Sequence, residues 1–399
     1  MLVEKNKDLT ILTPDHLINV LNEVNASSFI DQFGPEEVAQ IYDPFNNTQA
    51  VLVIDNSALG PAIGSIRIAN DVSPKNTFLL ARDTSYKSAL FELPFGGAQV
   101  GIKTNSNSID KSKLLKSLGK AIEPLIPWRY IVSLDSQFNA HDINDFIEVI
   151  GDRKGITGKP EKTGGSSYNA GTIGFGVGIS IESSIKALHE ILNLPESLED
   201  VKISIDGWNN TSIDFAKILI SKGAKITAIS DKQTTIFNEN GLEFEELKKS
   251  FSLSNIASLS KNFTNSENIP KEKILNVDSD ILVLTNTPGI ISENNLDQIK
   301  ANLIIEATND SLNDKIEQKL YDKCKWTIPN LLTMSGNIIS GYSEYSEKSI
   351  SEAFSLIESK IKSATEEIIF LSFRSELLPR FVAKDIAQAR ILEAIENKN

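Results

Sequence analysis

The strongest constraint on the fold lies after residue 200, where apolar, strand-like segments alternate with helical ones. VKISI at 201–205 precedes the helical pattern SIDFAKILISKG, and KITAIS at 225–230 follows it. ILVLT at 281–285 and NLIIEA at 302–307 continue the alternation. Strands that are connected through helices run parallel and need helices on both faces of their sheet. This half of the chain therefore predicts a doubly wound parallel sheet in an α/β fold.

The first 150 residues predict a second α/β domain. AVLVI at 50–54 and SIRI at 65–68 are typical of strands, and residues 111–126 and 142–150 carry apolar positions at helical spacing. A chain of 399 residues is too long for one compact core and suits two domains. No internal repeat is found.

A glycine-rich segment, Gly155 to Gly178, lies between these halves. So many permissive residues predict a hinge or a ligand-facing loop, and a plain flexible linker is the alternative. Residues 179–192 should then form a helix. The stretch 346–399 should be almost wholly helical, with a break near Leu378-Pro379.

Charge and residue usage exclude several classes of function. The net charge of −13 argues against a general affinity for nucleic acid or an anionic membrane, since both need a basic face. One cysteine and three histidines exclude an internal disulfide and make a His/Cys metal site a poor hypothesis. No apolar run reaches the roughly 18 residues of a membrane span, and the first residues do not have the pattern of a secretion signal. We expect a cytoplasmic protein.

The turn after VKISI has the place of a dinucleotide-binding turn but only part of its sequence. The fingerprint has glycine at its first, third and sixth positions, where this chain has Gly207, Asn209 and Ser212. Asp231 ends the second strand, where a ribose-binding carboxylate belongs, and the helix N-terminus offers N–H groups to an anion. The alternative is a parallel-sheet domain that no longer binds a nucleotide.

Three further segments carry a family resemblance. The first is TSYKSA at 84–89 followed by LPFGGAQVG at 93–101, and the second is ITGKP at 156–160. The third is EATN at 306–309 followed by PNLL at 329–332 and Gly336. In this order and at these intervals the segments resemble the glutamate/leucine/phenylalanine/valine dehydrogenase family over almost the entire chain.

The resemblance implies a domain plan and a reaction. A substrate and oligomerisation domain would comprise residues 1–178 and 372–399, and a Rossmann-like nicotinamide-binding domain 179–371, with the last helix returning to the first domain. The implied reaction is oxidative deamination, in which hydride passes from the α-carbon of an L-amino acid to the nicotinamide. Water then converts the imine to a 2-oxo acid and ammonia. The family is oligomeric, so we expect a homo-oligomer or a hetero-oligomer with an active homologue.

Matching positions give the site residues that the resemblance implies. Lys87 would bind the α-carboxylate, Gly97 would lie in the substrate loop, and Asp135 would accept the proton of the amino group. A solvated surface lysine and a turn-capping aspartate are the alternatives for Lys87 and Asp135. Because a carboxylate at position 231 would repel a 2′-phosphate, NAD is favoured over NADP. The cofactor residues would be Gly207, Asn209, Asn210, Asp231 and Asn309.

Gln99 is the main departure from the family, because it stands where the catalytic lysine is expected. An amide neither takes up a proton near pH 7 nor carries charge, so general acid–base catalysis and oxyanion stabilisation should both suffer. Lys103, four residues on, is the alternative source of an amine. Ile173 and Gly341 also occupy positions where members of the family carry polar groups.

Ile63 bears on the substrate. Glutamate-selective members carry a lysine in the corresponding glycine-proline segment, which reads GPAIGS at 60–65 here. An apolar residue cannot compensate a buried carboxylate, so an aliphatic or aromatic amino acid is favoured, although Ile63 could equally fill the core. Two functions remain open: an amino-acid dehydrogenase of altered or slow chemistry, and an inactive paralogue that binds a ligand or regulates an active dehydrogenase.

Overall fold

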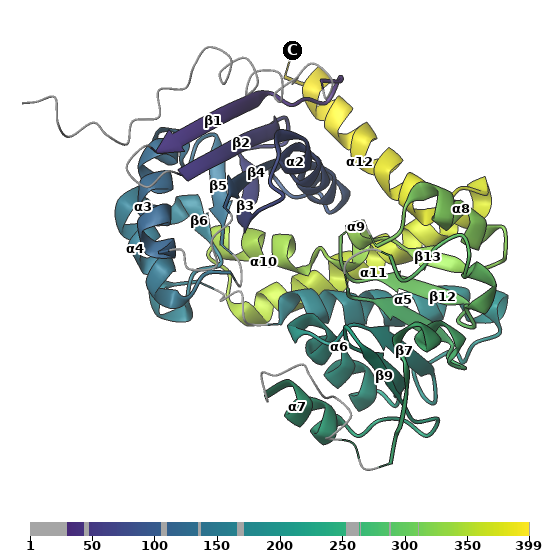
Figure 1. The fold of residues 1–399 in the computed structure, drawn as a ribbon. Coiled ribbons are helices and arrows are strands. Elements are labelled where there is room, and N and C mark those ends of the chain that lie inside the picture. Colours follow the sequence, from purple (N-terminus) through teal and green to yellow (C-terminus); the bar gives the residue numbers. More distant parts are fainter. Residues whose placement is uncertain are drawn as a thin grey trace, which may run out of the picture. The chain divides into compact units, whose positions relative to one another are not determined.

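The computed structural model describes residues 30–43, 48–104, 110–134, 137–165, 171–252, 263, 265–286, 289–309 and 311–398. The chain folds into two compact units, which are drawn in Figure 1: unit 1 comprises Met1–Tyr168 and Ala387–Asn399, and unit 2 comprises Asn169–Ile386. The expected domain ends at 178 and 371 fall inside the continuous helices α5 (Thr172–Leu192) and α11 (Ile350–Ser375). The chain instead passes between the units before α5 and within α12 (Pro379–Glu396).

Unit 1 is built on a six-stranded mixed sheet in the order β1-β2-β4-β3-β5-β6. Strands β3 to β6 pair in parallel, whereas β1 and β2 pair antiparallel. The strands are β1 (Glu37–Asp43), β2 (Thr48–Asn56), β3 (Ala62–Ala69), β4 (Gly96–Lys103), β5 (Tyr130–Ser133) and β6 (Ile156–Thr157). The helices are α2 (Pro74–Leu90), α3 (Lys111–Ile122) and α4 (Ala140–Ile150), with short 3₁₀ turns at Glu123–Leu125, Arg153–Gly155 and Glu161–Thr163.

Helices cover both faces of this sheet, as strand alternation requires (Figure 1). Leu52 and Ile54 of β2 point into the core formed with α3 and α4, which includes Phe146. Val53 lies on the opposite face, against α2. Gln99 is the register partner of Val53, and cross-strand partners share a face, so Gln99 lies on the side of the sheet that α2 covers.

Unit 2 has a seven-stranded sheet in the order β10-β9-β8-β7-β11-β12-β13. Strands β8, β7, β11, β12 and β13 pair in parallel, and β9 and β10 extend the edge antiparallel. The predicted doubly wound sheet is therefore confirmed, with its topological switch point between β7 and β11. The strands are β7 (Lys202–Asp206), β8 (Lys225–Ser230), β9 (Thr234–Phe237), β10 (Glu267–Pro270), β11 (Ile281–Leu284), β12 (Leu303–Glu306) and β13 (Trp326–Ile328).

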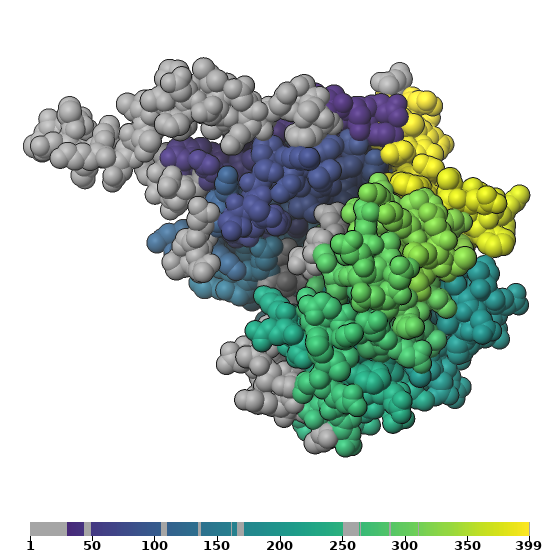
Figure 2. Space-filling view, turned by 45° about the vertical axis from the view of Figure 1, so that its right-hand side comes forward, coloured from purple at the N-terminus to yellow at the C-terminus, as the bar shows by residue number. Residues whose placement is uncertain are grey.

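The remaining helices of unit 2 flank this sheet. They are α6 (Asn210–Ser221), α7 (Phe244–Ser252), α8 (Asp314–Tyr321), α9 (Asn330–Thr333) and α10 (Gly336–Tyr345), with 3₁₀ turns at Lys271–Asn276 and Leu296–Gln298. The predicted break near Leu378-Pro379 separates α11 from α12. Part of α12 is exposed at the molecular surface, where Figure 2 shows it in yellow. Within the described residues no helix is long and apolar enough to cross a membrane.

The glycine-rich segment, Gly155 to Gly178, does not form a loop along its whole length. Helix α5 begins at Thr172 and contains the last three glycines of the segment. A Cβ atom at Gly174 would lie 2.8 Å from the carbonyl oxygen of Thr211, and one at Gly176 would lie 2.9 Å from the side chain of Ile361. These glycines allow α6 and α11 to pack closely on α5. The expectation of a loop is therefore wrong for residues 172–178, and residues 166–170 lie outside the described part of the chain.

Candidate functional site

Gln99 lies in the middle of β4 with only 4% of its surface exposed. Its amide oxygen and nitrogen each lie 3.2 Å from the hydroxyl oxygen of Ser65 on the neighbouring strand β3. The amide nitrogen also donates to the carbonyl oxygen of Val100, at 3.3 Å. Both ends of the carboxamide are thus held by neutral partners within the sheet, and the group cannot exchange a proton near pH 7.

Ile63 and Gly97 are register partners on β3 and β4. Ile63 is 1% exposed. A Cβ atom at Gly97 would lie 2.3 Å from both the carbonyl oxygen of Ala81 and the backbone nitrogen of Ser85. The backbone of α2 therefore lies directly against this strand, and position 97 has room only for glycine.

Lys87 lies near the C-terminal end of α2 and is 8% exposed, so it is not a solvated surface lysine. Its ammonium lies 2.7 Å from the carboxylate of Asp83, one helical turn earlier. Because residues four apart share one face of a helix, the two side chains present a positive and a negative group together. Asp135 falls outside the described residues.

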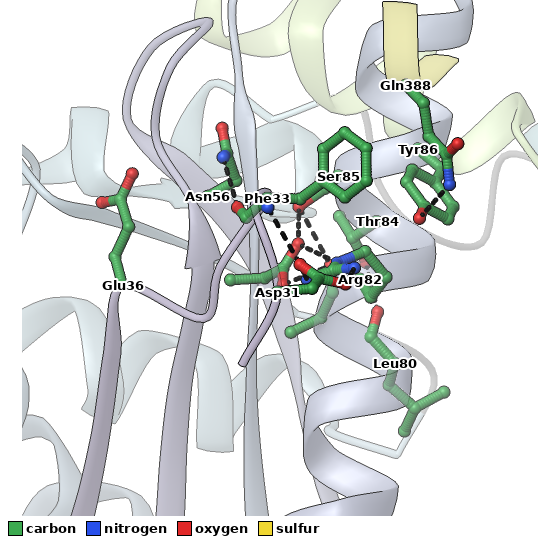
Figure 3. Close-up of polar contacts among 12 residues, drawn as sticks. Asp31, Phe33, Glu36, Asn56, Leu80, Arg82, Thr84, Ser85, Tyr86 and Gln388 are labelled. Atoms are coloured by element: carbon green, nitrogen blue, oxygen red, sulfur yellow. Dashed lines mark hydrogen bonds and ion pairs between the residues drawn. The ribbon is translucent and has the colours of Figure 1, made fainter. Parts of the chain in front are cut away.

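A charge cluster built around the buried Arg82 and Asp55 holds α2 against the end of β2 (Figure 3). Nε of Arg82 donates to both carboxylate oxygens of Asp55, at 2.8 and 2.9 Å, and its terminal nitrogens donate to Asp31, at 2.7 and 2.9 Å. The hydroxyl of Ser85 donates to Asp55 at 2.6 Å. The guanidinium lies over the ring of Phe78, 4.9 Å from its centroid, a favourable cation–π arrangement.

Burial is the largest single influence on the pKa of each carboxyl in this cluster, but it prevails only at Asp55. It raises the pKa of Asp55 to about 6, against the lowering effect of the Arg82 charge. Burial also acts to raise the pKa of Asp31, but the hydrogen bonds from Arg82 and from the Phe33 backbone outweigh it and hold that pKa below its usual value. This cluster was not predicted from the sequence. No helix was predicted over residues 74–90, and the partners of Arg82 lie 27 and 51 residues away in the chain.

In unit 2 the turn after β7 keeps its glycine but uses its other two key positions for helix capping. Gly207 has φ of 109°, and a Cβ atom there would lie 2.4 Å from the hydroxyl of Thr285. The side-chain oxygen of Asn209 accepts from the backbone N–H of Ser212, at 3.1 Å, and the Ser212 hydroxyl lies 3.3 Å from the backbone nitrogen of Asn209. Asn210 is the first residue of α6. The chain's own side chains thus satisfy N–H groups that a pyrophosphate would otherwise bind.

Asp231 follows β8, as the sequence predicted, and its side chain closes the next turn. One carboxylate oxygen accepts from the backbone N–H groups of Gln233, at 2.7 Å, and Thr234, at 2.8 Å.

The switch point of the sheet brings the glycine turn close to the end of β11. The side-chain nitrogen of Asn209 donates to the carbonyl oxygen of Thr285, which directly follows β11, at 3.3 Å. Gly207, Asn209 and Thr285 therefore meet at the switch point, where open α/β sheets bind their ligands.

Asn309 is held by a second buried charge network. Its side-chain oxygen accepts from Asn330, at 3.1 Å, and the backbone N–H of Asn330 donates to Glu306, at 3.4 Å. Arg380, at the start of α12, pairs with both Glu306 and Glu317. Burial raises the pKa of Glu306, against the lowering effect of the Arg380 charge. Within the described residues, no group of His, Cys, Asp and Glu side chains could hold a metal ion.

Taken together, a mixed-sheet domain and a doubly wound sheet with a glycine turn at its switch point define a two-domain α/β protein with a nucleotide-binding fold. The family follows from comparison with known proteins. Residues 164–384 match the model of the Glutamate/Leucine/Phenylalanine/Valine dehydrogenase family, and residues 35–149 match its dimerisation domain. The chain belongs to this family of amino-acid dehydrogenases.

Relatives are similar over most of the chain. The NAD-specific glutamate dehydrogenase of Staphylococcus aureus is 27% identical, over 85% of this chain and 83% of that protein. The NADP(+)-dependent glutamate dehydrogenase of Pyrobaculum calidifontis is 27% identical, over 73% of this chain and 71% of that protein. The hetero-hexameric glutamate dehydrogenase of Thermus thermophilus, solved in a leucine-bound form, shares the fold with a TM-score of 0.79 at 20% identity, covering 97% of this chain and 98% of that one. Family relatives thus include users of both nicotinamide cofactors.

Proposed function

We propose that this protein binds an L-amino acid with an aliphatic or aromatic side chain but does not deaminate it at the rate of a dehydrogenase. The observation that carries the proposal is the buried, fully hydrogen-bonded carboxamide of Gln99. Deamination needs a group that moves protons near pH 7 as water adds to the imine, and an amide cannot do so. Losing general acid–base catalysis typically costs about 10²- to 10⁴-fold in rate, or roughly 3–5 kcal/mol.

Lys103 does not replace the missing amine. It ends β4 and is exposed, four residues from Gln99. At about 3.3 Å per residue, four residues of strand separate the two backbone positions by about 13 Å. Residues 99 and 103 point to the same face of the sheet, so the Lys103 side chain would have to extend back along the strand to reach the position of Gln99. The exposed position of Lys103 does not favour that direction.

The proposed ligand follows from Lys87 and Ile63. Lys87 would bind the α-carboxylate, and Ile63 offers no charge to a second carboxylate, so leucine or phenylalanine is a better ligand than glutamate. Gly97 would belong to the same ligand site, where the lack of a side chain lets α2 lie directly against β4. Asp135 would accept a hydrogen bond from the amino group of the ligand.

For the cofactor we propose NAD rather than NADP, bound weakly. Gly207, Asn210 and Asn309 would line the site, and the Asp231 carboxylate would repel a 2′-phosphate. The capping pair of Asn209 and Ser212 supports weak binding, because it occupies N–H groups of the α6 N-terminus.

A regulatory or ligand-binding subunit of an oligomer is the role that best suits such a protein. The match of residues 35–149 to the family's dimerisation domain supports assembly with a second copy or with an active homologue. The second candidate function is an active dehydrogenase with another base. The Lys87–Asp83 pair favours it, because its ammonium and carboxylate lie 2.7 Å apart and could transfer a proton.

Calorimetry combined with a rescue series tests the proposal. We expect L-leucine or L-phenylalanine to bind the native chain at least about tenfold more tightly than L-glutamate, with no NAD reduction. Q99K alone should stay inactive, and Q99K/N209G/S212G should gain turnover, because it restores both the amine and the glycine turn. Failure of all three amino acids to bind would refute the proposed ligand class. Turnover by the native chain would support the second candidate instead.

A further inference from the structure

We propose that Asp83 makes the amino-acid site around Lys87 electrically neutral, so that it selects a zwitterionic amino acid over the 2-oxo acid with the same side chain. This inference rests on the proposed function and adds to it the charge class of the ligand. Asp83 is thereby a specificity-determining residue that contacts the α-ammonium group, in addition to its contact with Lys87.

The carboxylate of Asp83 is placed to act on whatever binds Lys87. Oδ2 of Asp83 lies 2.7 Å from Nζ of Lys87, and the two side chains are 25% and 11% exposed. A pair this shielded from solvent is screened less than a surface ion pair, so its charge still matters to a ligand a few ångströms away. An anion that approaches Lys87 must also approach Asp83.

The other basic side chains on or next to the C-terminal half of α2, those of Arg82 and Arg390, also form ion pairs with carboxylates. Arg82 pairs with Asp31 and Asp55, which leaves that cluster with more acidic than basic groups. Arg390 of α12 donates to the carbonyl oxygen of Leu90 and pairs with Glu92, at 3.1 Å. Gln99 adds no charge.

Lys75 is the remaining cation on α2, at its N-terminal end. It lies twelve residues from Lys87, or about 18 Å along a helix that rises 1.5 Å per residue. That distance exceeds the Debye length at physiological ionic strength, which is about 8 Å. Among the described residues of α2 and their ion-pair partners, the charges near Lys87 therefore offer an incoming anion no excess of positive charge.

A zwitterion and an anion meet this pair differently. An amino acid brings a carboxylate for Lys87 and an ammonium for Asp83, so both members keep an opposite charge after solvent is displaced. A 2-oxo acid brings the carboxylate but no cation, and its carboxylate is repelled by Asp83. The site should therefore bind the amino acid, the substrate of the family reaction, and reject the 2-oxo acid, its product.

The test compares L-leucine with 4-methyl-2-oxopentanoate, which share one side chain, by isothermal titration calorimetry on the full chain. The native protein should bind leucine at least about tenfold more tightly. D83N should bind the 2-oxo acid about tenfold more tightly than the native chain does, and D83S should behave alike if D83N does not fold. D83E keeps the charge and should keep the preference. D71N removes the carboxylate of the exposed Arg67–Asp71 pair, which has the same four-residue spacing, and should change neither affinity.

Two outcomes overturn the inference, and they differ from each other. If the native chain binds both ligands equally, or if D83N and D83S leave the preference intact, Asp83 does not select the ligand while the proposed function stands. If the native chain binds neither L-leucine nor L-phenylalanine, the proposed function fails and this inference fails with it.

Discussion

Replacing Asp55 with asparagine tests whether burial raises the pKa of the carboxyl group that pairs with Arg82. Asp55 is fully buried, and burial raises its pKa from 3.8 to about 6 despite the Arg82 guanidinium. A carboxyl with a raised pKa in the folded state holds its proton more tightly there than in the unfolded chain. Its stabilising contribution is therefore fully present below about pH 4 and is lost as the pH rises through 6.

The size of the effect follows from the two pKa values. The difference between 3.8 and about 6 corresponds to about 3 kcal/mol of unfolding free energy, lost between about pH 4 and pH 7. Asparagine does not titrate. The free energy of unfolding of the native chain minus that of D55N should therefore fall by about 3 kcal/mol across this window.

Urea unfolding followed by circular dichroism at pH 4, 5, 6 and 7 measures this difference. D278N is the matched control, because the side chain of Asp278 is 92% exposed and its loss should leave the pH dependence unchanged. Parallel pH profiles for the native chain and D55N would refute the reasoning, since the buried carboxyl would then titrate equally in the folded and unfolded states.

Three further substitutions have expected outcomes. G97A should lower the free energy of unfolding by at least about 2 kcal/mol in urea titrations, because the new Cβ meets the α2 backbone, whereas G178A in α5 meets only ordinary contacts and should be neutral or stabilising. R380Q leaves two fully buried glutamates without their cation and should cost about 3–5 kcal/mol by the same measurement, against less than about 0.5 kcal/mol for R374Q on the neighbouring helix. Equal losses in the two arginine variants would contradict the account of the buried network. D231S should improve NADPH binding relative to NADH about tenfold in dinucleotide fluorescence titrations, and an unchanged ratio would remove Asp231 from the ribose site.

Much of the fold could be predicted from the sequence because its signals are local. Apolar strands that alternate with helices have one stable arrangement, a parallel sheet covered on both faces, and the structure has it. The strands around Ala50–Ile54 and Ser65–Ile68 and the helix break at Pro379 were predicted for the same reason. The role of Gly174 and Gly176 was predicted wrongly, because glycine occurs both where helices pack closely and where a loop is flexible.

The charge networks could not be predicted, because their partners lie far apart in the chain. Arg82 meets Asp55 across 27 residues, and Arg380 meets Glu306 across 74. The motif LPFGGAQVG identified Gln99, which lies in strand β4 rather than in a loop, but its partner Ser65 lies 34 residues away on another strand. Spacing alone also pointed to no special role for Asp83, whose carboxylate changes the charge that Lys87 offers.

The deamination rate of the native chain tests the central claim most directly. Formation of NADH and NADPH would be followed at 340 nm with each of the twenty amino acids, and the reverse reaction with 2-oxo acids and ammonium. The neutral carboxamide of Gln99 predicts no turnover above about 10⁻² s⁻¹ in either direction, at least 10²-fold below the lower end of ordinary enzymes. A turnover number of about 1 s⁻¹ or more with any amino acid would contradict the claim, because another group would then be moving the proton.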